Sequence, residues 1–318
     1  MAPYRLDLTV CALRRLSTNV VDLLTPQGAY VRALSGFRKP VIVRVAQKGA
    51  RARALSITID GDVRDDAAVL DVLRQTLGTD CSLSSFYRAA ARIPWLAPLA
   101  GRMRGVKPPR HPSLWEACSN AIVFQQVSVR AASAIMQRLI VAVGRPVETD
   151  DLPVPVYLFP TPESVQRATT RSMRTIGLSA GKIATLRRVA EALSSGTLKV
   201  AALERCSSPD AVTILQQIKG IGPWTAALIL LRGLGRLDVF PANDASVVRN
   251  IALLAGSASF DVRHVLDTLG SQRGMLYYHL LLGRLEARDE LGLPSFADVP
   301  CNLRRAPRSG YDPHIHGR

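Results

Sequence analysis

Apolar and polar residues alternate in three stretches of the first sixty residues. These stretches are Tyr4–Val10, Pro40–Ala46 and Ala52–Ile59, and such alternation is typical of strands with one buried face. Residues Ala67 to Leu77 instead place apolar side chains three to four positions apart, which predicts an amphipathic helix. The pattern therefore predicts that the chain opens with a small α+β domain.

A helical pattern dominates the rest of the sequence. Residues Ser82–Ala91 favour a helix. Gly101–Arg110 is predicted to be a basic linker that ends in prolines, and Pro153–Pro162 a proline-rich loop between helices. From Ser113 onward almost every segment repeats with helical spacing. We predict an N-terminal domain over residues 1–105, a helical core over 106–300 and a basic, disordered tail over 301–318.

One helical segment is interrupted by a glycine-rich turn. Ser208-Pro209-Asp210 is typical of a helix start, and the helix that follows breaks at Gly220-Ile221-Gly222-Pro223 before a second, apolar helix begins at Trp224. Glycines leave the backbone open to a phosphate, and the start of the second helix favours an anion. Lys219 adds a positive charge beside the turn. A turn that only ends a helix has the same composition, so the pattern alone leaves both interpretations open.

The charge balance favours a polyanionic partner. The chain has 41 Lys and Arg against 25 Asp and Glu, a net charge of +16, which points most simply to nucleic acid. Its five cysteines are scattered without a Cys-x-x-Cys pair, which argues against a disulfide framework or a zinc knuckle. There is no transmembrane-length apolar run and no secretory leader pattern. We expect a protein of the cytoplasm or nucleoid, or of the nucleus in a eukaryote.

The glycine-rich turn carries a family resemblance. Leu215–Ala226 resembles the helix-hairpin-helix of base-excision DNA glycosylases, and Gly233–Asp244 resembles the Gly/Pro loop and aspartate of the same signature. His111–Ser133 and Ile176–Leu186 resemble further helices of that family. The resemblance covers about residues 108 to 290. It points to the HhH-GPD superfamily and, within it, to the AlkA type, 3-methyladenine DNA glycosylase II.

The resemblance implies a fold and a catalytic residue. The fold is α+β, with a small N-terminal antiparallel sheet domain followed by an all-α helix-hairpin-helix core. Asp244 is the predicted catalytic carboxylate, twenty residues after Trp224. Ionised, it would stabilise the oxocarbenium character of the sugar and orient water. An aspartate that merely caps the next helix would look the same in sequence.

Trp224 stands where bifunctional relatives have the lysine that forms a Schiff base. An indole cannot form one, so we predict a monofunctional glycosylase without lyase activity. Its ring is also predicted to line the pocket for the extruded base, where an aromatic face attracts a cationic purine, although a core tryptophan fits equally well. The predicted base-pocket residues are Trp224, Phe124, Tyr277 and Tyr278.

DNA contacts are predicted around the turn and the loop that faces it. The resemblance assigns Gln125 and Gln126 to the gap left by the extruded base, although the AlkA type has an apolar wedge at the position of Gln126. Leu228, Leu281 and Leu282 also replace aromatic residues of that type. The remaining predicted DNA-binding residues are Lys219, Gly220, Gly222 and Thr225. The resemblance implies no cofactor and no catalytic metal, and it allows a structural monovalent cation at the hairpin.

These observations predict a monofunctional glycosylase that excises alkylated bases of the 3-methyladenine and 7-methylguanine class during base excision repair. Its predicted partner is double-stranded DNA containing damaged bases, bound by a monomer with no membrane association. Two alternatives stay open. One is a glycosylase for oxidised or deaminated bases, and the other is a helix-hairpin-helix protein that binds DNA without chemistry.

Overall fold

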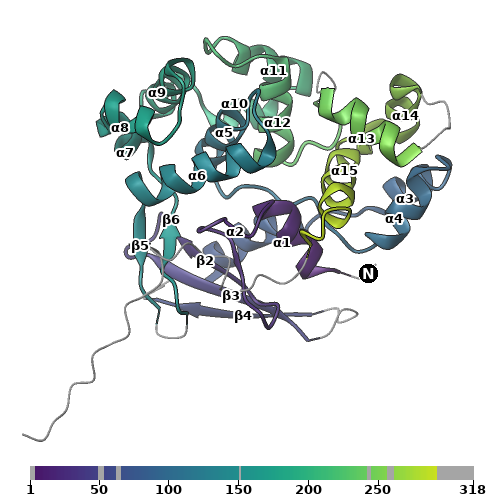
Figure 1. Ribbon diagram of the computed structural model, residues 1–318, viewed down its shortest axis with the longest axis horizontal. Helices are drawn as coiled ribbons and strands as arrows, with labels where there is room; N and C mark the ends of the chain where they lie inside the picture. Colours follow the sequence, from purple (N-terminus) through teal and green to yellow (C-terminus); the bar gives the residue numbers. More distant parts are fainter. Residues whose placement is uncertain are drawn as a thin grey trace, which may run out of the picture.

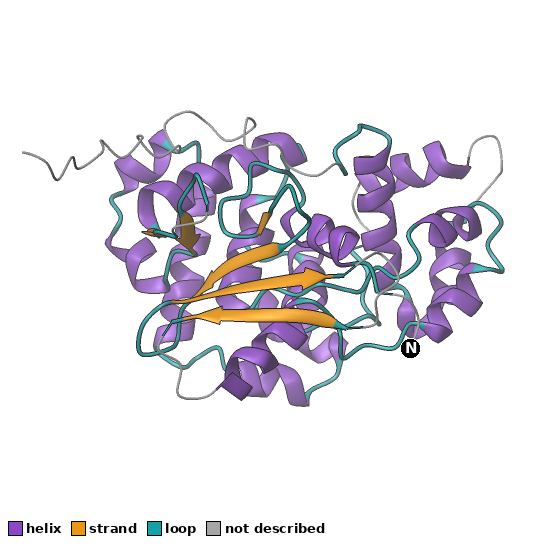
Figure 2. Cartoon of the chain, turned by 90° about the horizontal axis from the view of Figure 1, so that it is seen from below, coloured by secondary structure: helices purple, strands orange, loops and turns teal. Residues whose placement is uncertain are grey.

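The computed structural model describes residues 4–48, 54–61, 66–149, 152–241, 245–255 and 261–291 of the 318-residue chain. An antiparallel sheet in the order β1-β2-β3-β4 is followed in sequence by a large helical part, which confirms the predicted α+β class. In Figure 1 the sheet lies below most of the helices, and Figure 2 shows its strands side by side in one layer. The first elements are α1 (Leu6–Arg14), β1 (Leu23–Leu24), β2 (Tyr30–Leu34), β3 (Val41–Gln47), β4 (Leu55–Asp60), α2 (Asp66–Thr76), α3 (Ser84–Ala90) and α4 (Leu96–Arg102).

The helical part contains a short β-hairpin and most of the helices. Its elements are α5 (Leu114–Val123), α6 (Val129–Val143), β5 (Arg145–Val147), β6 (Val156–Leu158), α7 (Pro162–Arg167), α8 (Thr170–Thr175), α9 (Ala180–Ser194), α10 (Val200–Arg205), α11 (Ser208–Gln216), α12 (Pro223–Gly233), α13 (Ala245–Ala255), α14 (Val262–Leu269) and α15 (Gly274–Glu286). Helix α5 is buried on almost every side and packs against α9 and α12. No described helix has the length and apolar character that crossing a bilayer requires.

The first predicted strand is wrong, because Tyr4–Val10 leads into helix α1. Seven consecutive residues of α1, from Leu8 to Arg14, are buried, and the helix contacts α15 on one side and strands β1 and β2 on another. A helix that is enclosed on most sides needs no polar stripe. The short alternation in Leu6-Asp7-Leu8 therefore does not report a strand.

The predicted loop at Pro153–Pro162 contains strand β6 instead. Strand β6 pairs with β5 and lies beside β2, where Val156 and Leu158 join Val31, Ala33 and Ile42 in a small apolar cluster. The opposite face of the sheet joins the main core. Both faces of β2 are therefore buried, which its five consecutive buried residues reflect.

The predicted linker Gly101–Arg110 is mostly interior chain. Residues 105–109 are buried, and the backbone N–H of Lys107 donates to the hydroxyl of Thr9 at 3.1 Å. One hydrophobic cluster joins α1, the sheet, α2, α3 and α4 to α15 near the other end of the described chain. No separate core ends at residue 105, and the domain boundaries at 105 and 300 stay a prediction.

Candidate active site

The glycine-rich turn joins α11 to α12. Ser207, rather than the predicted Ser208, caps α11: its hydroxyl accepts the backbone N–H of Asp210 at 3.3 Å. Helix α12 begins at Pro223 with Gly222 as its N-cap residue. Proline suits that position because its missing N–H would have no helical partner there. The result is the predicted pair of helices around a tight turn.

Gly220 is required at its position for two reasons. Its φ of +104° lies in a region that residues with a side chain rarely adopt. A Cβ atom at this site would also lie 2.0 Å from the hydroxyl oxygen of Thr185, a buried residue of α9. Gly222 differs, because a Cβ atom added there would have no heavy atom of the surrounding structure within 4 Å. Of the two glycines of the turn, only Gly220 is fitted closely against α9.

A cavity of about 1130 Å³ opens beside the turn. Its walls come from the end of α1, the loop between α5 and α6, the turn with the first part of α12, and helices α13 and α15. Cavities of this size accommodate a ligand with several rings. Elements from both ends of the chain therefore meet around one space.

Three of the four predicted base-pocket aromatics line this cavity, namely Phe124, Trp224 and Tyr277. Tyr278 does not, and its assignment is corrected: its side chain is fully buried, and its hydroxyl donates to the carbonyl of Pro109 at 2.9 Å. Neighbouring residues on a helix point about 100° apart, so Tyr277 and Tyr278 face different surroundings. Among the leucines that replace family aromatics, Leu228 and Leu281 line the cavity.

The two predicted glutamines have different environments. The Gln125 side chain amide donates to the carbonyl of Gly220 at 2.9 Å and to the hydroxyl of Thr225 at 2.8 Å. It therefore ties the α5–α6 loop to the turn. Gln126 is exposed, lines the cavity and has a φ of +53°. Gln126 is therefore exposed at the cavity, whereas the Gln125 amide is bonded to the turn.

The other predicted DNA-binding residues lie at the turn. Lys219 is exposed, and its carbonyl accepts from Arg188 at 3.2 Å. Gly220, Gly222 and Thr225 line the cavity, and Thr225 is buried with its hydroxyl accepting from Gln125. In that contact the Thr225 hydroxyl is the acceptor, and a hydroxyl that accepts still has a proton to donate to a phosphate oxygen. The role of Thr225 in DNA binding stays a prediction.

A structural cation at the hairpin stays a prediction. The carbonyls of Ile218, Lys219 and Gly220 each already accept a hydrogen bond from a protein donor. Any cation at this turn would have to share these oxygens or use others. Across the described ranges, no three His, Cys, Asp or Glu side chains lie close enough together to hold a metal ion.

The predicted catalytic residue, Asp244, lies outside the described residues. In the sequence it directly precedes α13, and four residues of α13 line the cavity, namely Val247, Arg249, Leu253 and Leu254. The structure therefore describes the helix that follows Asp244 as part of the cavity wall. The carboxylate itself stays a prediction.

Arg15 is a cavity residue that the sequence did not suggest. It follows the end of α1 with a φ of 64°, only 4% of it is exposed, and it lines the cavity. Its guanidinium carbon lies 3.7 Å from the centre of the Phe124 ring, and Nη2 donates to the Tyr277 hydroxyl at 3.2 Å. Burial lowers the pKa of the Arg15 guanidinium, although Tyr277 opposes this shift. Burial raises the pKa of Tyr277, but the charges of Arg15 and Arg232 outweigh it and lower that pKa overall.

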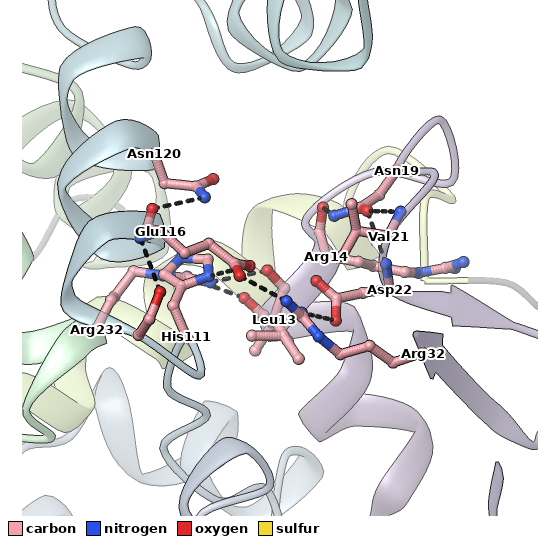
Figure 3. A network of polar contacts seen from close by, with 12 residues as sticks. Leu13, Arg14, Asn19, Val21, Asp22, Arg32, His111, Glu116, Asn120 and Arg232 are labelled. Atoms are coloured by element: carbon pink, nitrogen blue, oxygen red, sulfur yellow. Dashed lines mark hydrogen bonds and ion pairs between the residues drawn. The ribbon is translucent and has the colours of Figure 1, made fainter. Parts of the chain in front are cut away.

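A buried polar network holds the end of α1 in place (Figure 3). Arg232 of α12 is fully buried and donates to the carbonyls of Ala12 and Leu13 at 3.0 and 2.8 Å. Its Nε also donates to Nε2 of His111 at 3.4 Å. These bonds satisfy carbonyls at the end of α1 that have no partner within the helix. They fix the backbone immediately before Arg15.

The same network continues toward the sheet through Glu116. Nδ1 of His111 lies 3.2 Å from this carboxylate, and Arg32 bridges Glu116 and Asp22 at 2.5 and 2.6 Å. Burial alone would raise the pKa of Glu116, but Arg32 and His111 lower it to about 2. Burial lowers the pKa of His111 to about 4, with Glu116 opposing this shift. A charged carboxylate and a neutral imidazole therefore share the interior.

The described cavity lining is electropositive with apolar edges. It includes four arginines, Arg15, Arg249, Arg284 and Arg288, and the described lining residues contain no Asp or Glu. Two exposed apolar side chains, Val127 and Leu253, also line it, with 38% and 76% of their surface accessible. A positive, partly apolar surface of this kind suits a nucleotide, which combines a phosphate with a flat base.

Comparisons with known proteins match the predicted family. The sequence model of the HhH-GPD superfamily, base excision DNA repair proteins, matches residues 120–268. DNA-3-methyladenine glycosylase 1 of Schizosaccharomyces pombe is 34% identical over 153 residues, which cover 48% of this chain and 62% of that protein. The chain spans about three fifths of the length of the first curated relatives it matches, at 62% and 61%.

Two solved structures extend the likeness. The 3-methyladenine DNA glycosylase from Archaeoglobus fulgidus matches with a TM-score of 0.74 and 25% identity, over 90% of this chain and 97% of that chain. A 3-methyladenine DNA glycosylase of Schizosaccharomyces pombe in complex with abasic DNA matches with a TM-score of 0.50 and 27% identity, over 63% of this chain and 97% of that one. The family model and the named relatives therefore support the HhH-GPD superfamily of base excision DNA repair proteins and, within it, the AlkA type.

Proposed function

We propose that this protein is a monofunctional DNA glycosylase that removes alkylated bases of the 3-methyladenine and 7-methylguanine class from double-stranded DNA. The observation that carries the proposal is the aromatic, electropositive cavity that opens directly beside the helix-hairpin-helix turn. The turn would bind backbone phosphate through Gly220 and Gly222, and a base extruded from the duplex would enter the cavity. The names of the relatives support the same reaction.

The proposed reaction breaks the bond between C1′ of the sugar and the base nitrogen. The bonding electron pair leaves with the base, and the sugar develops oxocarbenium character. Water then adds to C1′ and gives up a proton. Asp244 is the proposed group that stabilises the sugar's positive charge and orients this water. Trp224, in the first turn of α12, has no amine that could form a Schiff base with the sugar. The lyase reaction that would cut the strand therefore does not follow, and the DNA backbone is left intact.

Base release from methylated duplex DNA tests the proposal. The protein is incubated with the duplex, the released bases are identified by mass spectrometry, and the strands are analysed before and after alkali. Free 3-methyladenine or 7-methylguanine with strand breaks only after alkali supports a monofunctional alkylbase glycosylase. Breaks without alkali would indicate lyase activity. Tight DNA binding with no released base would favour a binding protein.

The Asp244→Asn variant tests the assigned catalytic carboxylate. Asparagine keeps the shape but removes the charge, so we expect DNA affinity within about twofold of the wild type and turnover reduced by about 100-fold or more. The measurements are single-turnover base release and equilibrium DNA binding. Asp238→Asn is the matched control, because Asp238 is an exposed acid shortly before the same loop. Equal rates for the Asp244 variant and the wild type would remove Asp244 from the mechanism.

A further inference from the structure

Arg15 brings a buried positive charge to the cavity wall. Its guanidinium lies face to face with the Phe124 ring at 3.7 Å and donates to the Tyr277 hydroxyl. None of the ion pairs among the described residues includes Arg15. A buried charge is costly unless polar groups compensate it. The two contacts therefore hold an arginine that is available to act on whatever occupies the cavity.

The backbone is arranged to place this arginine. Its φ of 64° with ψ of −68° is uncommon for a residue with a side chain, and it turns the chain away from the axis of α1. Arg232 fixes the two carbonyls at Ala12 and Leu13 just before it. The N-terminal part of the chain thus contributes a fixed residue to a cavity otherwise built by the helical part.

The position of Arg15 changes which bases the cavity favours. Aromatic faces attract cations, and the cavity holds the three aromatic side chains of Phe124, Trp224 and Tyr277. However, the Arg15 guanidinium already occupies a face of Phe124, and Tyr277 already accepts its hydrogen bond. A cationic base in the same space therefore gains nothing from the charge of Arg15, and its binding depends on the other aromatic faces. An uncharged base with a carbonyl oxygen would instead find a donor.

We infer that Arg15 raises the excision of uncharged purines that present an acceptor oxygen relative to excision of the cationic alkylpurines of the proposed function. The inference rests on the proposed glycosylase function and specifies its substrates. Arg15 is a specificity-determining residue in this scheme, and Asp244 keeps the role of stabilising the sugar.

The charge of the departing base explains why Arg15 affects the two kinds of purine differently. When the C1′–N bond breaks, the base takes both bonding electrons. A cationic base such as 7-methylguanine leaves as a neutral molecule and needs no help from a positive group. An uncharged base such as hypoxanthine leaves with a negative charge until it gains a proton from water. The positive charge of Arg15 stabilises that developing anion, which accelerates only the second reaction.

A pair of matched duplexes tests the inference. One carries hypoxanthine and the other 7-methylguanine at the same position; both purines present a carbonyl oxygen at C6, and they differ in formal charge. Single-turnover excision is measured for the wild type and for Arg15→Gln, Arg15→Met and Arg15→Lys. Loss of the charge in the Gln and Met variants should lower the ratio of hypoxanthine to 7-methylguanine rates by about tenfold or more. Arg15→Lys keeps the charge but loses the planar stack on Phe124, so its ratio should lie between those of the wild type and Arg15→Met.

Arg288→Gln is the control variant. Arg288 lines the same cavity but is exposed, so its removal should change both rates by the same factor and leave the ratio within about twofold. Thermal melting establishes which Arg15 variants are folded, and Arg15→Met serves where Arg15→Gln does not fold.

The outcomes separate the inference from the function it rests on. A folded Arg15→Gln or Arg15→Met protein with the wild-type ratio overturns the inference while base excision stands. A rise in the ratio also overturns it, because Arg15 would then favour the cationic base. Failure of the wild type to release any base, including 3-methyladenine, overturns the proposed function.

Discussion

At the scale of single residues, Gly220 shows how the turn depends on one missing side chain. Its backbone has a φ of +104°, and its nearest neighbour across the turn is Thr185 of α9. Gln125 donates to its carbonyl from the opposite side. The turn is held between α9 and the α5–α6 loop, so a change at Gly220 acts on both of these contacts.

Gly220→Ala should therefore destabilise the protein and weaken DNA binding. The backbone conformation alone costs about 1–3 kcal/mol for a residue with a side chain, and the new Cβ must also displace Thr185, whose hydroxyl lies 2.0 Å away. Urea unfolding measures the stability change. Adding Thr185→Ala should recover the steric part and leave the backbone part. No recovery in the double variant would show that the contact with Thr185 is not the cause.

Gly222→Ala is the matched control for that variant. Gly222 has a φ of −92° and no heavy atom within 4 Å of the added carbon, so we expect unfolding free energy within about 0.5 kcal/mol of the wild type. Any loss of DNA affinity in this variant would then come from the DNA side of the turn. Since phosphate contacts carry no base information, that loss should be equal for all sequences.

The sequence could predict some site residues but not others. Phe124 and Trp224 lie beside recognisable motifs, and both line the cavity. Of the two tyrosines predicted for the base pocket, Tyr277 lines the cavity and Tyr278 does not, because a family resemblance locates a helix segment but does not fix which of two neighbours faces the cavity. Arg15 lies outside the motifs, and its contacts with Phe124 and Tyr277 join distant parts of the chain. No local pattern reports such contacts.

At the scale of secondary structure elements, the wrong predictions also arise where contacts between distant parts of the chain decide the structure. Strands β3 and β4 and helix α2 follow clear periodicities and were predicted. The alternation in Tyr4–Val10 predicts a strand, but this segment leads into helix α1. Because α15 and the sheet enclose α1, its sequence lacks the polar stripe of a surface helix. Strand β6 was missed because its three residues, Val156–Leu158, are too few to show a periodicity. Only pairing with β5 and packing on β2 make them a strand.

Helix α1 depends on Arg232, which supplies donors to its last carbonyls. Arg232→Met should lower the free energy of unfolding by about 3–5 kcal/mol, because it leaves the buried carbonyls of Ala12 and Leu13 without their donors. It should also release the backbone before Arg15 and so change the ratio of hypoxanthine to 7-methylguanine excision. Urea unfolding and single-turnover excision measure the two effects.

Arg236→Met is the control at the element scale. Arg236 donates to the carbonyls of Leu203, Glu204 and Cys206 at the end of α10, so its loss should also reduce stability. None of the residues in these contacts lines the described cavity, and the excision ratio should therefore stay at the wild-type value. A ratio that shifts equally in both variants would attribute the effect to general loosening of the fold instead of to α1.

At the scale of the whole molecule, two buried histidines make stability depend on pH. His279 of α15 packs against Phe86 with ring centres 4.6 Å apart, and burial lowers its pKa to about 4. Burial lowers the pKa of His111 to a similar value, against the opposing effect of Glu116. Both imidazoles lie in the interior that joins the two ends of the chain, one beside α12 and the other within the main core beside α3.

Acidification from pH 6.5 to pH 4 should therefore destabilise the fold. In this range a histidine of the unfolded chain, with an ordinary pKa near 6.5, binds a proton while His111 and His279 stay neutral in the folded chain. The unfolded state binds more protons, so the unfolding free energy has its full value above pH 6.5. It falls as the pH approaches 4, by on the order of 3 kcal/mol for each histidine.

Urea unfolding at several pH values measures the slope of the unfolding free energy against pH. His279→Leu removes one titrating group and should reduce it by about half, whereas His264→Gln, at an exposed site on α14, should leave it unchanged. An unaltered slope in the His279 variant would mean that this imidazole already takes up its proton in the folded protein, and the acid sensitivity would then arise elsewhere in the interior.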